Sequence, residues 1–145
     1  MDEVPASEFI IRRIPPSQPE SSLDFVVRKD NNRARATSAS LGIRAGELGL
    51  SCSRLELTSP KMLLGQLKFS PVGWNVAIWK VSEIPMGLVV VITPSDPPDL
   101  DPGHCEIRGA PIYNKSLQSK LAKSSTILTE AEVDSIEPGD SPILS

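Results

Sequence analysis

Two segments of the chain are apolar enough to lie in the middle of a β-sheet. Residues from Trp74 to Val81 alternate between two faces, and both faces are largely apolar, which is typical of a strand buried on both sides. Leu88–Thr93 is a continuous apolar run that Pro94 ends, and it predicts a second buried strand. We therefore expect both segments to be central strands.

Shorter patterns predict the elements around these two strands. Ser59 has the character of an N-cap and Pro60 of a first helical residue, so a short helix is expected to begin there. A second, amphipathic helix is expected over Ser116–Lys123, because Leu117 and Leu121 are four residues apart. Further strands are expected at Glu8–Ile14, Asp24–Lys29, Gly49–Leu55 and Cys105–Arg108.

These elements predict an α+β fold, with a small mixed or mainly antiparallel sheet of about five to six strands and two or three short helices. A single globular domain is expected over residues 1–124. Most of its core is expected to come from Trp74, Val76, Ile78, Leu88, Val90, Ile92, Ile107, Leu117 and Leu121.

The segment 125–145 has a different composition from the rest of the chain. From Thr129 onwards it holds five carboxylates and no Lys or Arg, and Pro138 and Pro142 interrupt it. Such a segment is expected to bury too little apolar surface to offset its loss of entropy on ordering. We predict an acidic, mostly disordered tail with one helical turn at Thr129–Val133.

Composition narrows the class of protein. The 145 residues are 39% hydrophobic and 23% charged and carry a net charge of −3, which fits a globular domain and argues against general nucleic-acid binding. No apolar stretch approaches the roughly 18 residues that cross a membrane, and no signal-peptide core is present. We expect a cytoplasmic protein that makes no contact with membranes.

Five short motifs in a fixed order carry a resemblance to a known group. They are Ile11–Pro16, Arg35–Ser40, Gly49–Cys52, Gly87–Val90 and Gly103–Gly109. In this order the chain resembles a group of small uncharacterised bacterial proteins with an Arg-Ile-Pro-Pro start, a Ser-x-Ser pair and a Gly/Ala-His-Cys/Ala-x-Ile/Val-x-Gly segment. The resemblance covers roughly residues 9–122, and it implies a bacterial source and a coherent small domain but no reaction.

His104, the single histidine of the chain, is the candidate for a catalytic role. It follows the acidic, proline-rich stretch Pro94–Pro102 and begins an apolar run, so it is expected at a loop-to-strand junction. Its neighbour Cys105 should point to the opposite face of a strand, so a Cys–His dyad is not expected. No catalytic residue is assigned, and His104 is instead expected to be a junction residue or to face a shallow pocket.

A run of arginines and hydroxyl residues is the second candidate site. Arginine forks and hydroxyl groups suit phosphate or carboxylate, but the glycine-rich loops of the common nucleotide-binding motifs are absent. Alternatively, this run is a solvated basic loop. The candidates for anion or partner binding are Arg12, Arg33, Arg35, Ser38, Ser40 and His104, with Arg13 and Arg44 close to them in sequence.

No metal site and no cofactor are expected. Cys52 and Cys105 have no CxxC spacing and should be reduced thiols, and zinc would need a ligand beyond these and His104. Asp96, Asp99 and Asp101 lack the glycine and the final glutamate of an EF-hand loop, so they are expected to be solvated.

Two functions fit these observations. The first is a small non-catalytic protein-interaction subunit, an accessory or immunity-type partner of another protein in its bacterial operon. The second is a small enzyme of the ADP-ribosyl-transfer type that acts on a phosphorylated or nucleotide substrate and uses Arg35, Ser38 and His104. A cluster of Arg12 with these residues in one cleft would favour the enzyme, and their dispersal would favour the interaction protein.

Overall fold

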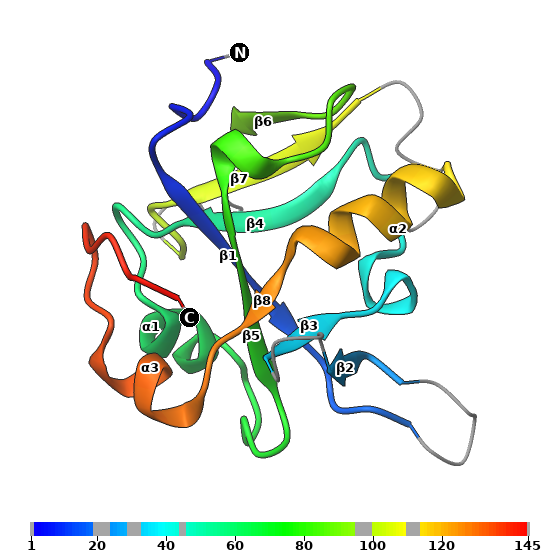
Figure 1. The fold of residues 1–145 in the computed structure, drawn as a ribbon. Helices are drawn as coiled ribbons and strands as arrows, with labels where there is room; N and C mark the ends of the chain where they lie inside the picture. The colour runs from blue at the N-terminus through cyan, green and yellow to red at the C-terminus, as the bar shows by residue number, and fades with distance from the viewer. Residues whose placement is uncertain are drawn as a thin grey trace.

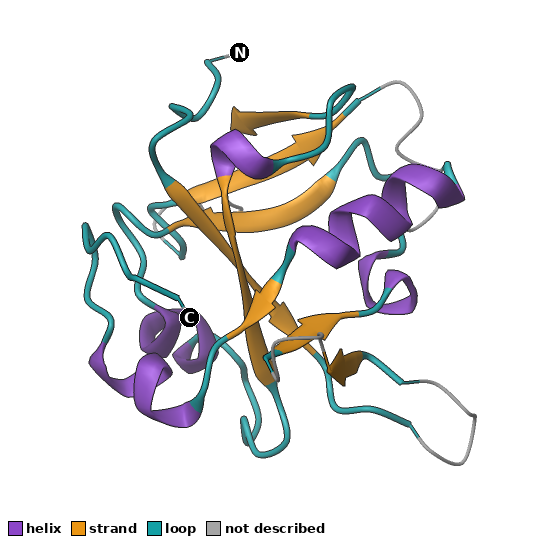
Figure 2. Ribbon diagram, viewed as in Figure 1, coloured by secondary structure: helices purple, strands orange, loops and turns teal. Residues whose placement is uncertain are grey.

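The computed structural model describes residues 2–18, 24–28, 33–43, 46–94, 100–109 and 114–144. It confirms the α+β class, with a six-stranded antiparallel sheet, a two-stranded sheet and three short α-helices in the described residues (Figures 1 and 2). The strands are β1 (Phe9–Ile14), β2 (Val26–Arg28), β3 (Ala34–Ala36), β4 (Leu50–Arg54), β5 (Asn75–Lys80), β6 (Val89–Ile92), β7 (His104–Arg108) and β8 (Thr126–Ile127). The helices are α1 (Pro60–Gly65), α2 (Lys115–Ser124) and α3 (Glu130–Ser135), with the 3-10 turns η2 (Ser38–Leu41) and η3 (Val81–Glu83).

The large sheet has the strand order β6-β7-β4-β1-β5-β8, so β4 and β1 lie in its middle. β1 pairs with β5 along its whole length, from Phe9 opposite Lys80 to Ile14 opposite Asn75. β5 also pairs with β8, which confirms that this apolar strand is internal to the sheet.

β6 lies at the edge of the sheet, so the prediction that Leu88–Thr93 forms a central strand is wrong. No strand of the sheet pairs with the outer edge of β6 in the described residues. The start of the chain lies there, and Val4 N donates to Val90 O and Ile92 N donates to Asp2 O, each at 2.8 Å. A continuous apolar run indicates burial but not position within a sheet, and here Val89 remains 43% exposed.

Each face of the sheet contacts its own hydrophobic cluster. Ile10 and Ile14 belong to the cluster under α2 and η2, whereas Ile11 points to the other face and packs with Leu63 of α1 and Ile136 beyond α3. The alternation of side chains along β1 explains this division. In Figure 1, α1 and α3 lie side by side and α2 lies apart from them.

Trp79, rather than Trp74, is the tryptophan of the core. Trp79 is 1% exposed and donates its indole N–H to Leu121 O at 2.9 Å, while Trp74 is half-buried. The other expected core residues are buried at Val76, Ile78, Val90, Ile107 and Leu121 and only partly buried at Leu88, Ile92 and Leu117.

The acidic C-terminal segment, for which composition predicts disorder, lies against the domain over residues 126–144 of the structure. Thr129 caps α3 in a reciprocal capping box with Glu132, and Leu128 and Ile136 are buried. Gly139 N donates to Leu55 O at 3.0 Å. Leu128 and Ile136 pack against apolar side chains of the domain, and this burial offsets the entropy that the segment loses on ordering. The composition of the segment alone does not reveal this contribution.

The expected helix start at Ser59 is confirmed, since the Ser59 hydroxyl accepts the Met62 N–H at 3.1 Å and Pro60 is the first helical residue. The helix over Ser116–Lys123 is confirmed as α2, with Asn114 as its N-cap. Within the described ranges, no helix has the length and apolarity needed to cross a membrane.

Candidate functional site

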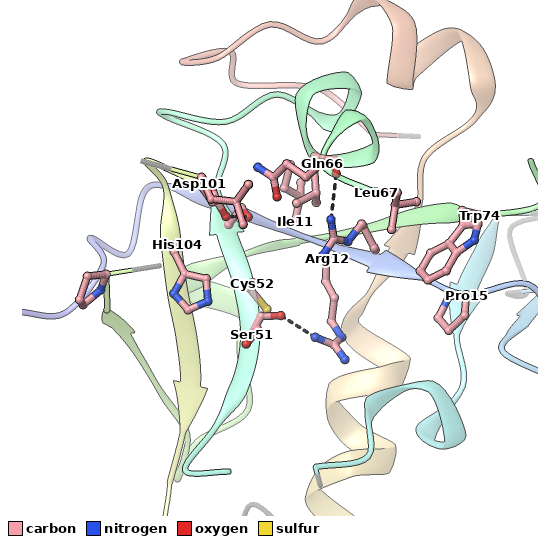
Figure 3. Close-up of a pocket in the computed structure, with 15 residues that line it drawn as sticks. Ile11, Arg12, Pro15, Ser51, Cys52, Gln66, Leu67, Trp74, Asp101 and His104 are labelled. Carbon is pink, nitrogen blue, oxygen red and sulfur yellow. Dashed lines mark hydrogen bonds between the residues drawn. The ribbon is translucent and has the colours of Figure 1, made fainter. Parts of the chain in front are cut away.

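A groove of about 570 Å³ lies where β1 and β4 separate, beneath α1. Figure 3 shows His104 and Asp101 at one end of this groove and Trp74 with Pro15 at the other. Its lining residues are Ile11, Arg12, Arg13, Pro15, Ser51, Cys52, Ser53, Leu63, Gln66, Leu67, Trp74, Pro94, Leu100, Asp101 and His104. Its size is in the range of small-molecule and peptide sites.

The groove exists because two central strands pair over a short distance only. β1 and β4 are in register at Ile10 opposite Arg54 and at Ile11 opposite Ser53, after which β1 continues beside β5 alone. Across the gap that follows, Arg12 Nη1 donates to the backbone oxygen of Ser51 at 2.6 Å. A guanidinium therefore makes a contact at the place where a continued ladder would have main-chain bonds.

Arg13 reaches the α1 side of the same gap, because successive residues of a strand point to opposite faces. Its Nη1 donates to Leu63 O at 3.2 Å, and its other N–H groups make no hydrogen bond to the described residues. Burial lowers the pKa of Arg13 below its ordinary value, and the attraction of Asp101 opposes this effect without reversing it. The guanidinium is still charged, but it has lost part of the hydration that stabilises this charge in bulk water.

His104 is fixed by the strands on either side of it. It lies opposite Ser53 of β4, and its Nδ1 is 2.8 Å from Thr93 Oγ1 and 3.2 Å from Thr93 O. Because a carbonyl only accepts, this contact favours a proton on Nδ1 and leaves Nε2 toward the groove, where it bonds to no described residue.

Asp101 is buried, not solvated as predicted, and it ties the loop before β7 to β4. Its carboxylate accepts hydrogen bonds from the Ser53 hydroxyl, from Thr58 Oγ1 at 2.6 Å and from Gly103 N at 3.1 Å. The side chain is 5% exposed, so these bonds replace lost hydration. Ser53 is thus a donor to a carboxylate and does not bond to His104. Asp96 and Asp99 lie outside the described residues.

Packing accounts for most of the Gly103–Gly109 motif. A Cβ on Gly103 would lie 2.8 Å from Arg54 O and from Thr58 Oγ1, and one on Gly109 would lie 2.9 Å from Leu88 Cδ2. Cys105 and Ile107 are both 0% exposed in the core. His104 is the member of the motif that lines the groove.

Apolar side chains lie at both ends of the groove. At the end away from His104, Trp74 stacks at a tilt on Phe69, with ring centroids 5.8 Å apart, and Leu67 lies beside it along the lining. Phe69 is 60% exposed and Leu100, at the His104 end, is 52% exposed. The groove therefore has apolar surfaces at both ends and cationic side chains between them.

The cysteines do not supply a nucleophile. Cys52 and Cys105 lie opposite each other on β4 and β7, and both are free and buried, as predicted for reduced thiols. Burial raises the pKa of Cys52 to about 12, and burial together with Cys52 raises the pKa of Cys105 still further. Neither thiol is ionised at neutral pH. Within the ranges that the structure describes, no cluster of His, Cys, Asp and Glu is arranged to hold a metal ion.

Of the six predicted site residues, only Arg12 and His104 line the groove. Arg33 donates to Ile127 O at 3.1 Å and to Glu132 at 2.9 Å, so it holds the C-terminal segment. Arg35 donates to Ala36 O at 2.9 Å, and the Ser40 hydroxyl donates to Thr37 O at 2.7 Å. Ser38 is exposed at the start of η2. Arg44 lies outside the described residues.

Sequence reasoning did not assign Arg13, Gln66, Trp74 or Asp101 to the site. One local signal was present: two adjacent arginines occupy the apolar strand Phe9–Ile14, so one guanidinium must lie on each face of it. The role of Asp101 depends on Ser53 and Thr58, which are 48 and 43 residues away in the chain.

Comparisons of the chain with protein-family models, with curated proteins and with solved structures found no match.

Proposed function

We propose that this protein is a non-catalytic interaction subunit, an accessory or immunity-type partner that works by binding another protein through the groove. The observation that carries the proposal is the groove itself, which is extended, open at the surface and lined by both cationic and apolar side chains. Partner surfaces are commonly recognised by such a mixture of aromatic, aliphatic and arginine side chains.

The state of the reactive groups supports a binding role. The Ser53 hydroxyl donates to Asp101, the Cys52 thiol is buried and protonated, and His104 is held by Thr93. Covalent catalysis requires an accessible nucleophile within hydrogen-bond reach of its base. The Ser53 hydroxyl does bond to the Asp101 carboxylate, but these two residues are only 2% and 5% exposed, so the pair is not presented to a ligand in the groove. The chemistry of the lining residues favours holding a ligand over transforming it.

Site-specific photocrosslinking in the source organism tests the proposal. A benzophenone amino acid in place of Trp74 should crosslink to one partner protein, and Arg13→Met should reduce that crosslink. The same amino acid in place of Met86, which is 96% exposed and does not line the groove, is the matched control. Equal crosslinking from both positions, or none from position 74, would contradict the proposal.

A second candidate is the phosphate- or nucleotide-directed enzyme. One observation favours it: Arg12 and His104 line the same groove, with Trp74 available to stack on a base. Arg35 and Ser38 lie elsewhere, so the residue set differs from the predicted one. Titration calorimetry with ADP separates the candidates. Saturable binding that His104→Ala and Arg13→Met abolish, together with turnover of a nucleotide, would establish the enzyme.

A further inference from the structure

The position of Arg13 and His104 in the groove limits the shape of a ligand that meets both. They lie on β1 and β7, with β4 between them, and Arg13 lies beyond the point where β1 and β4 are paired, so their backbones are separated by more than two strand spacings of about 4.8 Å. A ligand that touches both side chains therefore reaches across the groove from the β1 side to the β7 side, as an extended peptide segment of a few residues can.

The centre of the groove favours negative charge. Arg12 and Arg13 both project from its middle, so two guanidinium groups face the one carboxylate among the described lining residues, Asp101, which is buried and accepts hydrogen bonds from Ser53, Thr58 and Gly103. Arg13 is already partly buried, so it has less hydration of its own to lose when a carboxylate binds, and a charge-assisted bond from its fork offsets part of what the carboxylate loses.

The Trp74 end of the groove favours an apolar side chain next to that charge. Trp74 precedes Asn75, which pairs with Ile14 directly after Arg13, so the indole and the guanidinium lie near one another along β1 and β5. In an extended peptide, side chains two residues apart lie on the same face. A carboxylate on Arg13 and an apolar group on Trp74 thus suit positions i and i±2 of one segment.

We propose that the groove binds an extended segment of the partner protein, with an acidic side chain on Arg13, an aliphatic or aromatic side chain two residues away against Trp74, and a polar group further along on His104 Nε2. This inference rests on the proposed function and adds the chemistry of the partner. Backbone amides of a glycine-rich loop, which phosphate sites commonly use, do not line the described groove, and this favours carboxylate over phosphate.

A titration with a capped peptide tests the inference. The probe is acetyl-Ser-Leu-Ser-Glu-Ser-Leu-Ser-amide, whose symmetry places a leucine two residues from the glutamate in either binding direction. Nitrogen–proton NMR of the full chain resolves two indole N–H signals, which Trp74→Phe assigns. The peptide should shift the Trp74 signal, while the signal of buried Trp79, bonded to Leu121 O, stays in place as an internal reference.

Substitutions in the peptide leave the protein unchanged, so a loss of binding cannot come from a misfolded variant. They are therefore the sharpest controls. Glutamine in place of the glutamate should weaken binding about tenfold or more, the scale of a charge-assisted hydrogen bond. Alanine in place of both leucines should weaken it by a similar factor. On the protein, Arg13→Met should match the glutamine peptide, and Arg13→Lys should retain part of the affinity, because the charge remains and the fork is lost.

Three outcomes overturn the inference. They are no shift of the Trp74 signal at millimolar peptide, equal affinity for the glutamate and glutamine peptides, and Arg13-dependent binding of ADP or inorganic phosphate that competes with the peptide. If the photocrosslink from position 74 still captures a partner in any of these cases, the proposed function stands and only the chemistry of the segment is wrong. If the crosslink also fails, both fall.

Discussion

The indole N–H of Trp79 donates to the carbonyl oxygen of Leu121 at 2.9 Å, which ties the central strand β5 to the last turn of α2. Trp79 is 1% exposed, so the bond lies in a region without competing water.

We expect Trp79→Ala to reduce the free energy of unfolding by about 3–5 kcal/mol, because it removes a large packed side chain and leaves a cavity. Trp74→Ala should cost less than about 1 kcal/mol, since that side chain is half-buried at the groove. Denaturant melts of the two variants check this, and equal losses would contradict the assignment of Trp79 to the core.

The capping box of α3 should make the C-terminal segment sensitive to acid. Burial alone would raise the pKa of Glu132, but hydrogen bonds from Arg33 and Thr129 outweigh it and lower the pKa below the ordinary 4.5. The folded state therefore binds the proton less tightly than the unfolded state does. The stabilisation is complete above about pH 4.5 and is lost as the pH falls through the lowered pKa.

Glu132→Gln should remove this contribution at neutral pH and flatten the pH dependence of the melting temperature below about pH 4.5. Glu130→Gln is the matched control on the same helix, because its carboxylate is not part of the capping box. Thermal melts from neutral to acid pH measure both variants. Identical profiles for Glu132→Gln and the unmodified protein would show that the carboxylate does not hold the segment.

Close backbone contact at Gly103 predicts a large effect of one methyl group. Gly103→Ala would place a Cβ 2.8 Å from Arg54 O, and the rigid backbone there can yield only by moving β4 or the loop. We expect a loss of about 1–3 kcal/mol, the usual cost of overpacking. Gly42→Ala is the control, because a Cβ at Gly42 meets no atom within 4 Å and its φ of −69° suits alanine. That change should be neutral or slightly stabilising, and chemical denaturation of both variants is the measurement.

The two thiols should resist modification in the folded protein. Cys52 and Cys105 are 4% and 0% exposed, and burial raises the pKa of Cys52 to about 12, so almost no thiolate exists at pH 8. A disulfide reagent such as dithionitrobenzoate should react slowly with the native chain and rapidly with both thiols in guanidinium chloride. Fast labelling of either cysteine under native conditions would be inconsistent with its place in the core.

The local sequence pattern predicted which helices and strands the fold contains, but it did not predict which strands lie next to one another in the sheet. The double-sided apolar pattern around Val76 and Ile78, the Ser59-Pro60 helix start and the spacing of Leu117 and Leu121 all predicted elements that the structure contains. Which strand lies beside which depends on pairings between distant residues. For that reason the edge position of β6 could not be derived from its composition.

The C-terminal segment shows a different limit. Thr129 and Glu132 have the spacing of a capping box, and a single helical turn was expected there. Composition nevertheless favoured disorder, because the partner that holds Glu132 is Arg33, 99 residues away in the chain. The same distance effect explains why Arg33 looked like an anion-binding candidate: its carboxylate partner is absent from the local sequence.

The groove depends on a side chain at the point where β1 and β4 part. Main-chain ladders are nearly independent of residue type, whereas the Arg12–Ser51 contact is specified by one codon. A substitution at position 12 would therefore change the charge at this opening, while β1 keeps its full pairing with β5. The charge at the groove and the pairing of the core strands are thus set by different parts of the same residue, by the side chain of Arg12 and by its main chain.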